Sequence, residues 1–308
     1  MSSLADTPPD HPPLGRVLTA LATPFTDDGA LDLDGAAELA AYCVAHGSDG
    51  LVVCGTTGES PTLTHEETLA MFEVVVETVG DRASVVAGTG KNDTVATAAL
   101  TREATDRGVD GILLVTPYYN RPSQRGLTAH FEAAAAETDL PVILYNIPGR
   151  SAREIEVDTI IDLAERVPNI AGVKDAVGDL AKTSWVALRA PADFVIYAGD
   201  DAATLPLLAV GGHGVISVSS HIAGEVFAEM IAAFPHDPAR ALMLHQHILP
   251  LIDALMTTDT SPGPLKAALR MLGLPGGPVR PPLADVDDAG ATTIYTALAS
   301  YGLMEQPA

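Results

Sequence analysis

The chain has 308 residues, 47% of which are hydrophobic, and its formal net charge is −23 at pH 7. This length and composition suit a globular protein with a sizeable core, and no apolar run reaches the length of a membrane span. So strong a negative charge makes nucleic acid or an anionic membrane an unfavourable partner. Two cysteines, Cys43 and Cys54, are too few for a disulfide framework and are interpreted as buried apolar residues of a cytoplasmic protein.

The N-terminal residues 1–15 are rich in proline and lack both a basic start and a long apolar stretch. They are predicted to form a disordered lead-in and not a secretory signal. From residue 16 onward, short apolar runs typical of buried strands alternate with helical patterns. The predicted strands are 17–23, 50–54, 84–88, 111–116, 141–146, 170–176, 194–198 and 214–218.

Helical patterns separate these strands, and the best defined are 34–46, 64–79, 94–107, 124–138, 157–166 and 181–189. Thr64 and Glu67 are spaced as a capping box at the start of the second helix. Continuous apolar strands with helical crossovers indicate a parallel sheet that is covered on both faces. Eight such units predict a closed (β/α)8 barrel over residues 16–234. An open doubly wound sheet is the alternative, but the first strand is not followed by a dinucleotide-binding glycine pattern.

The last part of the chain contains only helical patterns, at 224–234, 238–257, 264–272 and 288–302. The first of these helices completes the barrel. Residues 235–308 are predicted to form a helical appendage packed on the barrel, and not an independent domain.

Lys174 lies inside the predicted sixth strand, I-A-G-V-K-D-A, and is one of only four lysines. Removing an ammonium group from water is costly, so a lysine in a core strand suggests that its amine has a chemical role. Burial lowers a lysine pKa, and a neutral amine can attack a carbonyl carbon. The structural alternatives are a side chain that extends past the strand end or one that pairs with Asp175.

Barrel enzymes carry their active sites at the C-terminal ends of the strands. In this sequence those ends bear hydroxyl, phenol and guanidinium groups, on Thr56, Thr57, Tyr119, Tyr145 and Arg150. Tyr145 is one strand before Lys174, so its hydroxyl is suitably placed to pass protons through Thr56 and Tyr119.

Other site classes find less support in the sequence. No metal-ligand set is recognisable, because His245 and His247 point to different faces of a helix. Asp200 and Asp201 follow the seventh strand, where barrel enzymes often bind phosphate, and two carboxylates would repel that group. Asp201 is expected to cap the following helix.

Five motifs occur at these strand ends: G-T-T-G-E-S (55–60), T-P-Y-Y-N-R-P-S-Q (116–124), L-Y-N-I-P-G-R (144–150), G-V-K-D-A (172–176) and G-G-H-G-V-I-S-V (211–218). Together they resemble the dihydrodipicolinate synthase / N-acetylneuraminate lyase family of class I, pyruvate-dependent aldolases. The resemblance extends from about residue 16 to about residue 303 and implies the same barrel fold.

The resemblance implies catalysis through a Schiff base between pyruvate and Lys174, with no metal and no separate cofactor. Tyr145 is then the proton donor and acceptor, and Thr56 and Tyr119 complete the proton relay. Tyr119 is expected to reach in from a neighbouring subunit of a homotetramer that is built as a dimer of dimers.

The same resemblance assigns the substrate contacts. Thr57 is expected to bind the pyruvate carboxylate, and Arg150 the carboxylate of the aldehyde, for which a planar cation is well suited. Main-chain groups at Gly199 and Ile216 complete the expected pocket.

The implied reaction joins pyruvate to L-aspartate 4-semialdehyde and gives 4-hydroxy-tetrahydrodipicolinate, the first committed step of diaminopimelate and lysine biosynthesis. Arg150 favours this acidic aldehyde. A sister aldolase acting on a 2-keto-3-deoxy sugar acid or on N-acetylneuraminate is the alternative. A barrel glycosidase with Glu59 and Asp200 as paired carboxylates is a rival of another class, but it leaves Lys174 unexplained.

Four residues match the positions of a lysine feedback site at the family's tight dimer interface: Ser60, His65, Asn92 and Tyr118. Ala96 stands where lysine-sensitive members carry a glutamate, and Thr68 where they often carry a histidine. Losing that carboxylate removes a partner for the ammonium groups of lysine, so weak or absent inhibition is expected.

Overall fold

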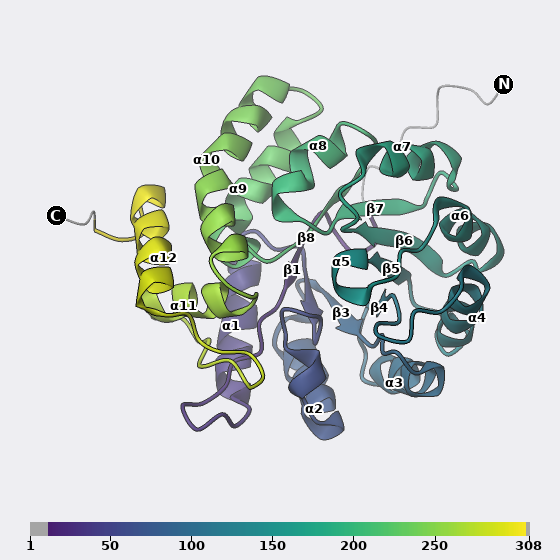
Figure 1. Cartoon of the computed structure of the whole chain (residues 1–308), viewed down its shortest axis with the longest axis horizontal. Helices are drawn as coiled ribbons and strands as arrows, with labels where there is room; N and C mark the ends of the chain where they lie inside the picture. The colour runs from purple at the N-terminus through teal and green to yellow at the C-terminus, as the bar shows by residue number, and fades with distance from the viewer. Residues whose placement is uncertain (1–11, 306–308) are drawn as a thin grey trace. The chain divides into compact units, whose positions relative to one another are not determined.

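The computed structural model describes residues 12–305, in which the strands form a closed barrel in the order β1 to β8 (Figure 1). The registers defined between neighbouring strands are parallel, as between β5 and β6. All of the predicted strands are present, with ends that differ by a few residues at most. They are β1 (Val17–Ala20), β2 (Gly50–Val53), β3 (Ser84–Gly88), β4 (Gly111–Val115), β5 (Val142–Asn146), β6 (Ile170–Asp175), β7 (Val195–Ala198) and β8 (Gly214–Ser217). The predicted barrel is therefore confirmed.

The well-defined helical patterns are also confirmed, as α1 (Leu33–Ala45), α2 (His65–Val79), α3 (Thr94–Asp106), α4 (Gln124–Ala135), α6 (Val157–Arg166) and α7 (Leu180–Arg189). Thr64 and Glu67 form the predicted capping box of α2. Four short helical segments were not predicted: η1 (Ser60–Thr62), α5 (Pro148–Ser151), η2 (Asp201–Ala203) and α8 (Thr204–Leu208). Segments of this length are too short to show a helical period in the sequence.

The C-terminal part is helical, as predicted, and contains α9 (Ser220–Ala233), α10 (Pro238–Thr257), α11 (Gly263–Met271) and α12 (Asp288–Tyr301). Helix α10 packs against both α9 and α12. Within residues 12–305, no helix is long and apolar enough to cross a membrane.

Two compact units make up the chain. One contains Val86–Ile216 together with the segment that ends at Arg16, and the other contains Val17–Val85 together with the segment that begins at Ser217. The C-terminal helices thus belong to the same unit as β1 and β2. The division at residue 234 between barrel and appendage stays a prediction.

The start of the described chain is ordered. Leu14 is only 1% exposed, and the carbonyl of Gly15 accepts a hydrogen bond of 2.9 Å from the Tyr197 hydroxyl. The disordered lead-in predicted for residues 1–15 therefore does not include these residues, and residues 1–11 lie outside the described part. Cys43 and Cys54 are both buried thiols, as expected.

Candidate active site

Lys174 on β6 is buried, with 5% of its surface exposed. Successive side chains of a strand point to opposite faces, so Lys174 and Asp175 diverge. The Asp175 carboxylate accepts hydrogen bonds from the Thr183 hydroxyl at 2.6 Å and from the amide of Val177 at 3.0 Å. Neither structural alternative for Lys174 therefore applies, because the side chain neither extends into solvent nor uses Asp175 as its partner.

Tyr145 on β5 lies directly beside Lys174 on β6, because the two residues are paired in the register of these strands. The Lys174 Nζ lies 4.3 Å from the centroid of the Tyr145 ring. The electron-rich face of an aromatic ring attracts a cation, which helps to fix the amine at this position. Tyr145 is itself 5% exposed, so amine and phenol share a largely dry environment.

Burial lowers the pKa of Lys174 from 10.5 to about 8. Loss of hydration is the main cause, and two nearby charges act in opposite directions. The Asp201 carboxylate raises the pKa and the Arg150 guanidinium lowers it. A substantial share of Lys174 is therefore neutral, and nucleophilic, in mildly alkaline solution.

Asp201 has a different position from the one predicted. Asp200 is the residue that caps η2, since its side chain accepts a hydrogen bond of 2.9 Å from the amide of Ala202. Asp201 is 1% exposed and lies within electrostatic reach of Lys174. Asp200, and not Asp201 as predicted, is therefore the N-cap residue of the next helical segment, and the Asp201 side chain is buried.

The loop after β5 carries Arg150 and is closed by Asn146. The Asn146 side chain donates a hydrogen bond of 2.9 Å to the carbonyl of Ile155 and accepts another of 2.9 Å from its amide. This reciprocal pair closes the loop that contains α5, and Pro148 begins that helix. Arg150 is exposed on α5, where an anionic ligand can reach it. Sequence reasoning missed Asn146, although an amide at the end of a core strand is a signal for such a role.

Gly199 follows β7 and lies against the strand that carries Lys174. Its amide donates a hydrogen bond of 2.7 Å to the carbonyl of Asp175. A Cβ at this position would lie 2.8 Å from the Cβ of Ala176, so a larger residue would push the two strand ends apart. Ile216 on β8 is 1% exposed. Gly199, Ile216, Arg150, Tyr145 and Lys174 all belong to the same compact unit.

Thr56 and Thr57 belong to the other unit, in the loop that follows β2. Thr57 is 5% exposed and Thr56 is partly exposed. Cys54 and Glu59, on either side of this loop, have positive φ angles of 55° and 54°. Such angles are uncommon outside glycine, so the loop has an unusual, tightly specified shape.

Tyr119 is the predicted site residue that is most open to solvent, with 89% of its surface exposed and a φ of 73°. In the single chain its ring therefore faces solvent. Its expected role in the active site of a neighbouring subunit stays a prediction.

The four residues of the expected lysine site are divided between the units. Ser60 and His65 belong to the unit of Thr56, whereas Asn92 and Tyr118 belong to the unit of Lys174. Thr68 is buried, and its hydroxyl donates a hydrogen bond of 2.9 Å to the carbonyl of Thr64, the N-cap residue of α2. The regulatory role of these residues stays a prediction.

Comparison with known proteins identifies the family of the chain. Residues 13–300 match the dihydrodipicolinate synthetase family. The 4-hydroxy-tetrahydrodipicolinate synthase of Moorella thermoacetica is 57% identical over 94% of this chain and 99% of its own length. A crystal structure of DHDPS from Cyanidioschyzon merolae with lysine bound has a TM-score of 0.93 and 43% identity, covering 94% of this chain and 99% of its own. A structure described as the first monomeric dihydrodipicolinate synthase variant has a TM-score of 0.91 and 35% identity, covering 94% of this chain and 97% of its own. The chain therefore belongs to the dihydrodipicolinate synthetase family.

Proposed function

We propose that the chain is a lyase that condenses pyruvate with L-aspartate 4-semialdehyde to give 4-hydroxy-tetrahydrodipicolinate, in diaminopimelate and lysine biosynthesis. The observation that carries this proposal is the buried amine of Lys174, which lies against Tyr145 and has a pKa lowered to about 8. The name and 57% identity of the Moorella thermoacetica relative support the choice of reaction.

The chemistry begins with attack of the neutral Lys174 amine on the keto carbon of pyruvate. Loss of water from the adduct gives an imine, and loss of a methyl proton gives the enamine. The enamine carbon then bonds to the aldehyde carbon, whose oxygen takes up a proton. Finally the amino group of the second substrate attacks the imine carbon and displaces Lys174, which closes the ring. Tyr145, adjacent to the amine, is the proposed proton donor and acceptor, in a relay with Thr56 and Tyr119.

Substrate binding is proposed to use charge and main-chain groups. Thr57 binds the pyruvate carboxylate, and main-chain groups at Gly199 and Ile216 complete the pocket. Arg150 binds the carboxylate of the aldehyde, supported by its exposure on a short helix that Asn146 holds in place. The imine on Lys174 serves in place of a cofactor.

We also infer a homotetramer, a dimer of dimers, in which Tyr119 serves the neighbouring subunit. The 89% exposure of Tyr119 in the single chain supports a role in contact with a second copy. A monomeric relative described as the first of its kind implies that oligomers are usual among the relatives. We also propose that the enzyme is cytoplasmic, which the two buried free thiols, Cys43 and Cys54, support.

A sister aldolase that acts on 2-keto-3-deoxy sugar acids or on N-acetylneuraminate remains the alternative. The glycosidase hypothesis loses support, because the Glu59 side chain is fully buried in an ion pair with Lys266 and is not exposed to a substrate. A direct test compares purified enzyme on pyruvate plus aspartate semialdehyde with enzyme on each sugar acid. The proposal expects condensation with the semialdehyde at a kcat/KM at least a hundredfold above any sugar-acid cleavage. The reverse preference would assign the chain to the sister activity.

A further inference from the structure

The loop that carries Thr56 and Thr57 is held in a strained shape. Its two flanking residues, Cys54 and Glu59, have left-handed backbone angles that residues with a Cβ rarely adopt. Strained backbone of this kind persists only where surrounding contacts fix it. One such contact is a hydrogen bond of 2.8 Å from the Thr23 hydroxyl to the carbonyl of Gly58.

A stronger contact comes from the C-terminal helical part. The Glu59 carboxylate accepts a bond of 2.5 Å from the Lys266 Nζ and a bond of 2.8 Å from the amide of Arg280. Both side chains of the ion pair are 0% exposed. The Lys266 Nζ also donates to the carbonyl of Pro278 at 2.9 Å and lies 4.2 Å from the centroid of the Phe25 ring. The ammonium group of Lys266 on α11 thus contacts Glu59, Pro278 and Phe25.

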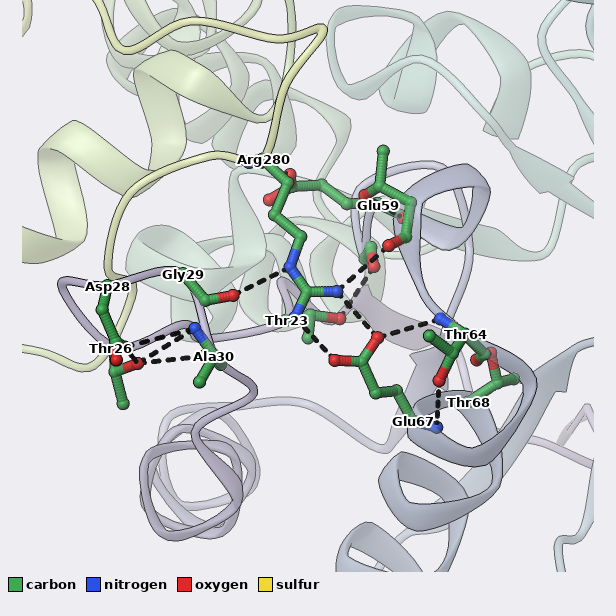
Figure 2. A network of polar contacts seen from close by, with 12 residues as sticks. Thr23, Thr26, Asp28, Gly29, Ala30, Glu59, Thr64, Glu67, Thr68 and Arg280 are labelled. Carbon is green, nitrogen blue, oxygen red and sulfur yellow. Dashed lines mark hydrogen bonds and ion pairs between the residues drawn. The ribbon is translucent and has the colours of Figure 1, made fainter.

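The Arg280 side chain contacts residues on segments next to this loop, and Figure 2 shows it between Gly29 and Glu67. Its guanidinium forms a two-point ion pair with Glu67 at 2.6 and 2.7 Å, and donates at 3.0 Å to the carbonyl of Thr62, just past Glu59. It also donates at 3.0 Å to the carbonyl of Gly29. Arg280 and Lys266 thus connect the loop after β2 with the start of α2 and the turn near Gly29, all within one unit.

A buried ion pair is an expensive way to stabilise a fold, because both charges lose their hydration. Apolar side chains of similar volume would often stabilise the fold to the same extent or more. The ion pair also fixes the position of the Glu59 side chain, because its carboxylate is held between two donors, the Lys266 ammonium and the Arg280 amide. The reaction proposed above has no use for Lys266 itself.

From these contacts we infer that Lys266 and Glu59 are positioning residues, which fix the Thr56–Thr57 loop in the shape that binds pyruvate. The inference rests on the proposed function for the roles of Thr56 and Thr57. It assigns to α11 and the segment around Arg280 a part in substrate binding, although neither contains a catalytic residue.

The most informative variant is Glu59→Gln combined with Lys266→Met. It removes both charges and retains the side-chain volumes and an acceptor for the Arg280 amide, so the fold should be retained. We expect the KM for pyruvate to rise about ten- to hundredfold, as small misplacements of binding groups do. The KM for the semialdehyde should stay within about twofold, since its proposed contact is Arg150 in the other unit.

Glu59→Gln alone is the second variant, because a buried lysine without its carboxylate can become neutral and need not unfold the protein. It should shift the pyruvate KM in the same direction. Arg240→Gln is the matched control, since it removes an exposed ion pair with Glu229 in the same unit. It should leave both KM values unchanged.

An unchanged pyruvate KM in a folded double variant, or an equal rise in both KM values, would overturn the inference. Failure of the proposed function has a different signature, because the wild-type enzyme itself would then either form no imine with pyruvate or not condense pyruvate with the semialdehyde.

Discussion

Lys174 has a pKa set by its surroundings more than by any single partner. Burial makes the ammonium unfavourable, Asp201 partly restores it, and Arg150 opposes it again. The result is a pKa of about 8, so the neutral share of the amine grows as the pH rises through that range. Because its pKa is lowered, Lys174 in the folded protein loses its proton at a lower pH than an exposed lysine does.

Asp201→Asn tests this balance most directly. Imine formation between the wild-type enzyme and pyruvate should rise with pH with a midpoint near 8. Removing the Asp201 charge removes the group that favours the ammonium, so the midpoint should move to lower pH. The measurement is the initial rate of borohydride-trapped adduct against pH. Asp200→Asn is the control, since Asp200 caps η2, and an equal shift in both variants would contradict the assignment.

Arg150→Ala separates the two substrates. The variant should lose most of its activity with the semialdehyde, about a hundredfold or more in kcat/KM, because a charge-assisted, two-point contact is lost. Trapping of pyruvate on Lys174 should persist, with its pH midpoint moved upward, since Arg150 lowers that pKa. Steady-state kinetics and trapping on the same preparation check both expectations. Loss of trapping at every pH would refute the separate roles.

The residue scale is also where the sequence was least informative. The sequence pattern cannot show which of two adjacent acids caps a helix. The predicted cap, Asp201, therefore differs by one residue from the observed cap, Asp200. Asn146 was missed for a related reason, because its partner Ile155 lies in a loop of no regular period. The proximity of Lys174 and Tyr145 could be predicted, because both lie near the ends of neighbouring regular strands.

Elements with a clear hydrophobic period were predicted well. The strands follow from short continuous apolar runs, and the long helices follow from helical patterns and from caps such as Thr64. The short helix α5 and the segment η1 could not be predicted, because they are too short to show a helical period. The segment η1 is also contacted by a distant residue, since Arg280 donates a hydrogen bond to the carbonyl of Thr62. Tertiary contacts from Lys266 and Arg280 to Glu59 help to set the shape of the loop that carries the proposed site residues Thr56 and Thr57.

Helix α3 provides a test at this scale. Ala96 lies in its first turn, where its amide donates to the Asp93 carboxylate. Because Ala96 offers no carboxylate to an effector, lysine should inhibit weakly or not at all. Ala96→Glu should increase inhibition by lysine at least about tenfold, as a partner for an ammonium group returns. Inhibition assays on both proteins decide the matter, and a sub-millimolar constant for the wild type would disprove the expectation.

At the scale of the whole molecule, the contacts divide the chain in a way that no local pattern indicates. The segment from Ser217 onward joins Val17–Val85, from which it is distant in sequence. The buried ion pair between Lys266 and Glu59 joins these two segments. The fold class follows from repeated local units, whereas this long-range division depends on contacts that sequence spacing does not reveal.

Assembly is the corresponding prediction. Sedimentation velocity should show a species of about four times the chain mass of 31.8 kDa. If Tyr119 serves a neighbouring active site, then Tyr119→Phe should lower kcat without changing that mass. Full activity in a stable monomer would contradict the shared site.

Covalent capture of pyruvate by Lys174 is the step on which every later step of the proposed reaction depends. Purified enzyme is incubated with pyruvate, reduced with borohydride, digested and measured by mass spectrometry. The expected result is one reduced pyruvate adduct, on the peptide that contains Lys174. Lys182→Ala, which removes a partly exposed lysine paired with Glu154, should be labelled as fully as the wild type, and Lys174→Ala should not be labelled. A wild-type enzyme without the adduct, or a Lys174→Ala enzyme that still acquires it, would contradict the central claim.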